Sequence, residues 1–172
     1  MKIVLLGYMA SGKSSIGKEL SENRILPFID LDAYIESKEE MTINTIFKEK
    51  GEIYFRRMEH AYLKELLNSE APFVLSLGGG TPCYANNMEL ILNSTATTSI
   101  YLQASIPTLV ARLIAGKEQR PLVKELGDEK LTEYVAKHLF ERRFFYEQAH
   151  KKLVIDKKEI VEIIAEIRLL LR

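Results

Sequence analysis

Residues 1–15 read MKIVLLGYMASGKSS, and this stretch decides the fold. Residues 2–6 form an apolar run without alternation, which is typical of a parallel strand buried on both faces. GYMASGKS, residues 7–14, then fits the pattern G-x-x-x-x-G-K-S/T at every fixed position, and residues 13–22 have helical spacing. A buried strand, a glycine-rich loop and a helix in this order predict a cradle for phosphate groups.

The chemistry of such a cradle assigns a role to each residue type. Glycines let backbone N–H groups turn inward around phosphate oxygens, and the helix that begins near Lys13 adds its positive N-terminal end. Lys13 would bring its charge to the outer phosphates of a nucleotide, and the Ser14 hydroxyl would bind Mg²⁺. The motif therefore indicates nucleotide binding, but it does not decide the reaction.

Strands and helices alternate along the rest of the chain. This order predicts βαβ units, hence an α/β fold with a parallel sheet covered by helices on both faces. We expect one domain spanning residues 1–172, since no linker or repeat divides it. The expected strands are 2–6, 28–31, 73–77, 99–102 and 153–155, and the expected helices are 13–22, 33–38, 42–50, 54–67, 88–92, 107–115, 131–150 and 158–171.

Composition narrows the classes of partner. The chain has 24 Lys and Arg residues against 24 Asp and Glu, so its formal net charge is zero. A neutral balance argues against a nucleic-acid or membrane-surface protein. Cys83 is the only cysteine, which excludes an intrachain disulfide and fits a reducing compartment. No apolar stretch approaches the roughly 18 residues of a membrane span, so we expect a cytoplasmic protein.

Asp30 and Asp32 offer two carboxylates after the second expected strand. The third strand, which often supplies an acid for the metal, carries none. Residues two apart on a strand point to one side, so both carboxylates would face the phosphate cradle at the carboxyl edge of the sheet. We assign Asp30 to the metal, through water, and Asp32 to positioning the acceptor hydroxyl. The alternative is that Asp32 only caps the helix at 33–38.

A second group of residues suits an anionic acceptor. Arg56 and Glu59 are three apart on a helix, so Glu59 could steady the guanidinium for a carboxylate ligand, or the two could form an exposed ion pair. Gly78–Gly80 follows a buried strand, which suits either close approach to a ligand or a sharp turn.

The remaining polar candidates are less distinctive. Arg142 or Arg143 could reach a pocket or form a solvated basic patch. The three histidines have no spaced partners, so we expect them, like Cys83, to be packing or surface residues.

The chain resembles the shikimate kinase family in an ordered set of motifs. These are GYMASGKSS, FIDLDAYIE, TINTIFKEKGEIYFRRME, LSLGGGT, QRPLV and ERRFFYEQA, and they run from about residue 1 to about residue 155. The resemblance implies a three-layer P-loop kinase fold with a five-stranded parallel sheet and a mobile lid at about 116–127. It implies MgATP-dependent phosphorylation of the 3-hydroxyl of shikimate, in the route to aromatic amino acids, by a monomer.

The resemblance also implies roles for individual residues. Asp32, Lys13 and Arg120 would be catalytic, with Arg120 entering on the lid, and the acceptor would bind over about residues 32–62. The implied ATP contacts are Ala10, Ser11, Gly12, Lys13, Ser14, Ser15, Arg112 and Arg120. The implied shikimate contacts are Asp32, Arg56, Glu59, Gly78, Gly79, Gly80 and Arg142, with Arg142 favoured over Arg143, and the implied metal ligands are Ser14 and Asp30.

Two other functions share the phosphate cradle. One is a kinase of another small acceptor, such as gluconate, and the absence of an inserted domain favours a small acceptor over a macromolecule. The other is a nucleotide-sensing module that has lost turnover, although it would have no need of Lys13, Asp32, Arg120 and Arg142 together.

Overall fold

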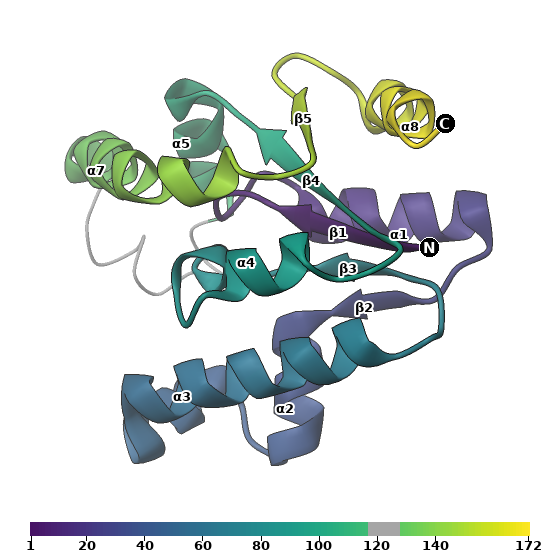
Figure 1. Ribbon diagram of the computed structural model, residues 1–172. Helices are drawn as coiled ribbons and strands as arrows, with labels where there is room; N and C mark the ends of the chain where they lie inside the picture. The colour runs from purple at the N-terminus through teal and green to yellow at the C-terminus, as the bar shows by residue number, and fades with distance from the viewer. Residues whose placement is uncertain (117–127) are drawn as a thin grey trace.

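A computed structural model describes residues 1–116 and 128–172 of the chain. It contains a five-stranded parallel sheet in the order β2-β3-β1-β4-β5, with helices on both sides (Figure 1). The strands are β1 (Lys2–Leu6), β2 (Phe28–Asp30), β3 (Phe73–Ser76), β4 (Thr97–Gln103) and β5 (Lys151–Val154). The sequence therefore predicted every one of these strands, with ends displaced by at most two residues.

The helices cover the sheet in two layers. Helix α1 packs against β1, β2, β3 and α8, whereas α4 packs against β4 and α3 on the opposite face (Figure 1). The described helices are α1 (Lys13–Arg24), α2 (Leu31–Glu39), α3 (Ile43–Asn68), η1 (Thr81–Cys83, a 3₁₀ turn), α4 (Asn87–Leu92), α5 (Ile106–Ala115), α7 (Asp128–Tyr146) and α8 (Ile160–Leu170).

Two helix predictions need correction. The helices expected at 42–50 and 54–67 run on as α3, although Gly51 has non-helical angles of φ 82° and ψ 168° and kinks it. The helix expected at 131–150 ends at Tyr146, because a turn follows in which Ala149 N–H donates to the Tyr146 carbonyl. Both misplacements concern helix ends, where turn hydrogen bonds rather than apolar spacing decide the boundary.

The core is centred on β1, the middle strand. Ile3, Val4, Leu5 and Leu6 are all fully buried, since β1 pairs with β3 on one side and β4 on the other. The strand order reverses around β1, so the loop that follows it opens into the crevice where open α/β sheets bind ligands. The glycine-rich loop therefore lies where the sequence predicted it.

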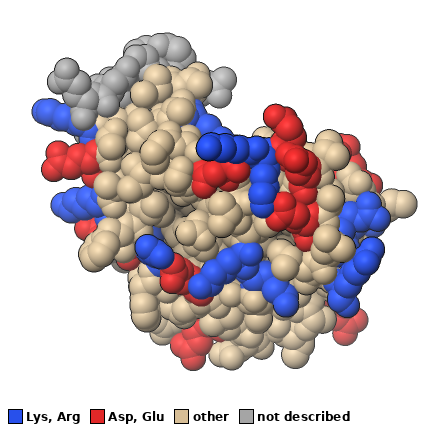
Figure 2. Space-filling model, turned by 90° about the horizontal axis from the view of Figure 1, so that it is seen from above, with Lys and Arg blue, Asp and Glu red and all other residues tan. Residues whose placement is uncertain are grey.

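The surface matches the balanced composition. Figure 2 shows Lys and Arg side chains interspersed with Asp and Glu on the face it presents. No helix within residues 1–116 and 128–172 is both long and apolar enough to cross a bilayer.

Candidate active site

The loop after β1 forms the floor of the site. It contains Ala10 with φ 63° and leads to Gly12, which precedes the first turn of α1 with φ 89°. Lys13 is 8% exposed, and its Nζ donates to the carbonyls of Gly7 and Tyr8 at 2.9 Å each. The lysine thus lies folded against the loop that its charge would serve.

Oxygen atoms gather beside this loop at the ends of β2 and β3. Ser14 Oγ donates to Asp30 Oδ2 at 2.8 Å and lies 3.4 Å from Ser76 Oγ. Ser76 occupies the last position of β3, where the sequence offered no acid, and sequence reasoning missed it. Among the described residues, no three His, Cys, Asp or Glu side chains form a metal-binding group. A cation here would therefore need oxygen atoms from a phosphate as well as those of the protein.

Asp30 and Asp32 both lie at the carboxyl edge of β2, but the reason given for their pairing was wrong. The strand ends at Asp30, and Asp32 is in the first turn of α2. Asp30 is itself the N-cap, since its Oδ1 accepts from the backbone N–H groups of Asp32 and Ala33. The alternative that Asp32 caps the helix is therefore wrong as well.

The environment of Asp32 favours its neutral form. Burial raises its pKa from 3.8 to about 6, the negative charges of Asp30 and Glu59 add to the rise, and Lys13 opposes it. A carboxyl with a pKa near 6 is largely ionised at neutral pH, yet basic enough to accept a proton from a hydroxyl.

Three consecutive glycines each face one charged side chain. A Cβ built on Gly78 would lie 3.2 Å from Asp32 Oδ1, one on Gly79 would lie 3.5 Å from Arg142 Nη1, and one on Gly80 would lie 3.0 Å from Arg56 Nη2. The run also turns sharply, since Thr81 N–H donates to the Gly78 carbonyl at 3.1 Å. None of the three glycines has a positive φ, so it is the nearby atoms, not a left-handed backbone, that leave little room for side chains. This run brings together residues from α2, α3 and α7.

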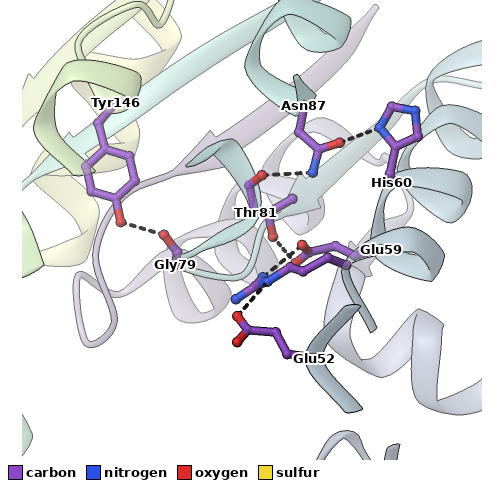
Figure 3. Close-up of polar contacts among 8 residues, drawn as sticks. Glu52, Glu59, His60, Gly79, Thr81, Asn87 and Tyr146 are labelled. Carbon is purple, nitrogen blue, oxygen red and sulfur yellow. Dashed lines mark hydrogen bonds and ion pairs between the residues drawn. The ribbon is translucent and has the colours of Figure 1, made fainter. Parts of the chain in front are cut away.

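Arg56 is held by more than a surface ion pair. Its Nη1 donates to Glu59 Oε2 at 2.9 Å, and Glu59 is only 1% exposed, so the expectation of an exposed pair is wrong. Tyr84 stacks on the guanidinium, with 4.0 Å between Cζ and the ring centre. Figure 3 shows Glu59 beside Thr81, which the sequence did not single out.

The long helix α7 presents Arg142, not Arg143, to the site. Arg142 is partly buried, with its Cζ 5.6 Å from the centre of the Tyr8 ring, whereas Arg143 is exposed and pairs with Glu147. Tyr146, also on α7, is fully buried and donates its hydroxyl to the Gly79 carbonyl (Figure 3). The structure places Arg142 rather than Arg143 beside the glycine run, and Tyr146 is a further contact that the sequence did not reveal.

A separate cavity of about 400 Å³ opens on the other side of the phosphate loop. Arg112 lines it, and its Nη1 donates to the Ala10 carbonyl at 3.3 Å. Lys158, just before α8, and Ile160, its first residue, also line the cavity, and the sequence left both without a role.

The remaining candidates from the sequence are Arg120, Cys83 and the histidines. Arg120 and residues 117–127 of the lid expected at about 116–127 are outside the described residues. Burial raises the pKa of the Cys83 thiol to about 11, which makes it unreactive at neutral pH. His60 bonds to Asn87 and His150 to Ser99, so both are packing residues as expected.

The sheet order, the phosphate loop after β1 and the charged side chains beside it place the chain in the class of P-loop kinases of small molecules. Comparison with known proteins narrows that class. The family model for shikimate kinase matches residues 9–171. A shikimate kinase of Flavobacterium psychrophilum is 51% identical over 170 residues, covering 99% of this chain and 98% of that one.

Solved structures of shikimate kinases are also similar to this chain. A shikimate kinase from Bacteroides thetaiotaomicron has a TM-score of 0.91 at 34% identity, covering 99% of this chain and 98% of that chain. A shikimate kinase from Acinetobacter baumannii in complex with shikimate has a TM-score of 0.85 at 30% identity, covering 99% and 92%. This chain belongs to the shikimate kinase family.

Proposed function

We propose that this enzyme transfers the γ-phosphate of ATP to the 3-hydroxyl of shikimate, giving shikimate 3-phosphate and ADP for the synthesis of chorismate and aromatic amino acids. The observation that carries the proposal is the glycine run at 78–80. One carboxylate, Asp32, and two guanidinium groups, Arg56 and Arg142, lie against this run, which itself lies beside the phosphate loop. A small acid with hydroxyl groups suits this arrangement, because arginine binds carboxylates through paired hydrogen bonds.

The phosphate loop and Lys13 hold the nucleotide tail. Backbone N–H groups of residues 10–15 bind phosphate oxygens, and Lys13 leaves the carbonyls of Gly7 and Tyr8 to contact the outer phosphates. Arg112 binds the nucleoside portion in the adjoining cavity. The loop thus fixes one reactant while the acceptor is fixed from the other side.

Asp32 orients the acceptor. Its carboxylate, ionised above pH of about 6, accepts a hydrogen bond from the attacking hydroxyl and takes its proton as the new P–O bond forms. Arg56 and Arg142 bind the carboxylate of the acceptor, and Glu59 keeps Arg56 in place. Most of the rate enhancement then comes from positioning and from neutralising phosphate charge.

The oxygen atoms beside the loop fit magnesium. Ser14 Oγ and Asp30 Oδ2, with Ser76 Oγ nearby, form the kind of hard donor set that Mg²⁺ takes together with phosphate oxygens and water. Ser14 would bind the ion directly and Asp30 through water. When bound, the ion would neutralise charge on the phosphates.

We further infer that the protein is cytoplasmic, because ATP is a cytoplasmic substrate and the single thiol suits a reducing compartment. We also infer that it is a monomer. Size-exclusion chromatography with light scattering tests the oligomeric state. The role of Arg120 stays a prediction.

A coupled ADP-release assay with shikimate and with gluconate tests the proposed reaction. We expect turnover with shikimate and little with gluconate. Arg56→Ala should raise the KM for shikimate by about 10²-fold and leave the KM for ATP near its original value, because it removes one arm of the carboxylate contact.

Arg57→Ala is the matched control, since Arg57 is the next residue on α3 and is exposed. Good turnover with gluconate but none with shikimate would overturn the assignment of the acceptor. ATP binding without transfer to either compound would favour the nucleotide-sensing module.

A further inference from the structure

A chain of hydrogen bonds runs from Arg56 to His60, and Figure 3 shows its members Glu59, Thr81, Asn87 and His60. Arg56 Nη1 donates to Glu59 Oε2 at 2.9 Å, and Thr81 Oγ1 donates to the other oxygen of the same carboxylate, Oε1, at 2.6 Å. Asn87 Nδ2 donates to the Thr81 carbonyl at 2.8 Å, and His60 Nδ1 lies 2.8 Å from Asn87 Oδ1. The chain thus links α3, η1 and α4.

The direction of each hydrogen bond in this chain is determined. Asn87 turns its NH₂ group toward the Thr81 carbonyl, so its Oδ1 faces His60 and accepts. His60 therefore donates from Nδ1. The Thr81 hydroxyl has only one proton, which it gives to Glu59.

Because Glu59 is buried, its carboxylate depends on the hydrogen bond that the Thr81 hydroxyl donates. Glu59 is 1% exposed, and Thr81 and Asn87 are fully buried. A buried carboxylate that loses one of its donors is strongly destabilised in its ionised, oriented form. Glu59 can hold Arg56 in one orientation only while Oε1 is satisfied from the far side, and Thr81 supplies that hydrogen bond.

Other contacts restrict Arg56 from its remaining sides. Tyr84 covers the face of the guanidinium, and Glu52 lies 3.5 Å from Nε. Gly80 crowds Nη2 from beneath, with a built Cβ only 3.0 Å away. In such a closely packed setting a small tilt of the guanidinium changes its alignment with a bound carboxylate, so the orientation set by Glu59 has consequences for binding.

We propose that Thr81 is a positioning residue for the acceptor's carboxylate, acting through Glu59 on Arg56, with Asn87 holding Thr81 from behind. The inference rests on the proposed function, because it assumes a carboxylate-bearing acceptor at Arg56. It adds a residue that neither contacts the reacting atoms nor belongs to the glycine run.

The experiment compares Thr81→Val with Thr81→Ser in steady-state assays, and measures equilibrium binding of shikimate by calorimetry. Valine keeps the shape of threonine but removes the hydroxyl, whereas serine keeps the hydroxyl. We expect Thr81→Val to raise both the KM and the Kd for shikimate about tenfold, with the KM for ATP nearly unchanged, and Thr81→Ser to restore most of the loss.

Two further variants separate positioning from folding. Ser99→Ala removes another fully buried hydroxyl, which bonds to His150 well away from Arg56, and should lower thermal stability without a selective effect on shikimate. In an Arg56→Ala background, Thr81→Val should add little to the KM for shikimate, because the group it positions is gone.

The outcomes distinguish this inference from the proposed reaction. If the unmodified enzyme fails to phosphorylate shikimate, the proposed function is wrong. If it turns over normally but Thr81→Val changes the KM values for shikimate and ATP equally, or only lowers the melting temperature, Thr81 is structural and the positioning role is wrong. A full, additive effect in the Arg56→Ala background would also overturn the positioning role.

Discussion

Ionisation of Asp32 has opposite effects on the stability of the protein and on its proposed activity. Its pKa is raised mainly by burial, so ionising it in the folded protein is unfavourable, yet the proposed proton acceptor must be ionised. Its folded-state pKa, about 6, is above the ordinary value of 3.8. The stability that Asp32 contributes is therefore fully present below pH of about 4 and is lost as the pH rises through about 6.

Asp32→Asn should change both kcat and the free energy of unfolding. We expect kcat to fall by about 10²–10⁴ if Asp32 accepts the proton, and by less than tenfold if it only orients the hydroxyl. The free energy of unfolding at pH 8 should rise by about 1–2 kcal/mol, allowing for solvent screening of a partly exposed group, with a smaller rise at pH 5. Urea titrations at the two pH values check this, with the exposed Glu49→Gln as control.

The pH dependence of the unmodified enzyme provides a further test at the same residue. We expect kcat/KM for shikimate to decline about tenfold per pH unit below a pH of about 6, since protonated Asp32 cannot accept the hydroxyl proton. This acid limb should be absent in Asp32→Asn. A profile that stays flat down to pH 5 in the unmodified enzyme would exclude Asp32 as the proton acceptor.

Among the elements, α3 departs most from simple sequence reasoning. Gly51 was expected to end a helix, and the chain does leave helical angles there, but helical hydrogen bonding resumes at once. A built Cβ on Gly51 meets nothing within 4 Å, so only its positive φ requires glycine. The opposite holds for Gly78–Gly80, where φ is ordinary and space is lacking.

Gly51→Ala should therefore affect backbone conformation alone. Because φ 82° with ψ 168° is a region that alanine rarely adopts, we expect a loss of about 1–3 kcal/mol in the free energy of unfolding. Alternatively the kink straightens, which would shift Arg56 and raise the KM for shikimate. Thermal unfolding and steady-state kinetics of the variant distinguish these results, and the exposed Lys48→Ala nearby is the control. A variant with unchanged stability and unchanged kinetics would contradict the need for glycine.

At the scale of the whole molecule, the strand order and the phosphate loop could be predicted because they depend on local patterns. These patterns are local because the apolar run at 2–6, the loop glycines and Lys13 all lie within a few residues of one another. Thr81, Asn87 and Tyr146 could not be found this way. Their roles depend on contacts with residues far away in the sequence, which span 22 residues for Glu59 with Thr81 and 67 for Gly79 with Tyr146.

Binding of the acceptor should stabilise the whole fold, because the site joins α2, α3 and α7. Shikimate at about 100 times its Kd should add about 2.7 kcal/mol to the free energy of unfolding, and raise the melting temperature by about 5–10 °C. Differential scanning calorimetry checks this, with gluconate as the control ligand. In Arg142→Ala the same concentration should produce a much smaller shift, whereas Arg143→Ala should respond like the unmodified protein. An equal shift in all three proteins would mean that the acceptor does not contact Arg142.

The glycine run has a practical consequence for dissecting the reaction. Its charged neighbours come from distant parts of the chain, and a methyl group added at each position would meet a different set of atoms. It would meet Thr81 Oγ1 and Asp32 at position 78, the Met9 backbone nitrogen and Arg142 at position 79, and Arg56 alone at position 80. Gly80→Ala would disturb the Arg56 guanidinium, whereas Gly78→Ala would disturb Thr81 together with Asp32, and Gly79→Ala would press on the phosphate loop at Met9. Gly80→Ala could thus weaken recognition of the acceptor at Arg56 without altering any charged residue.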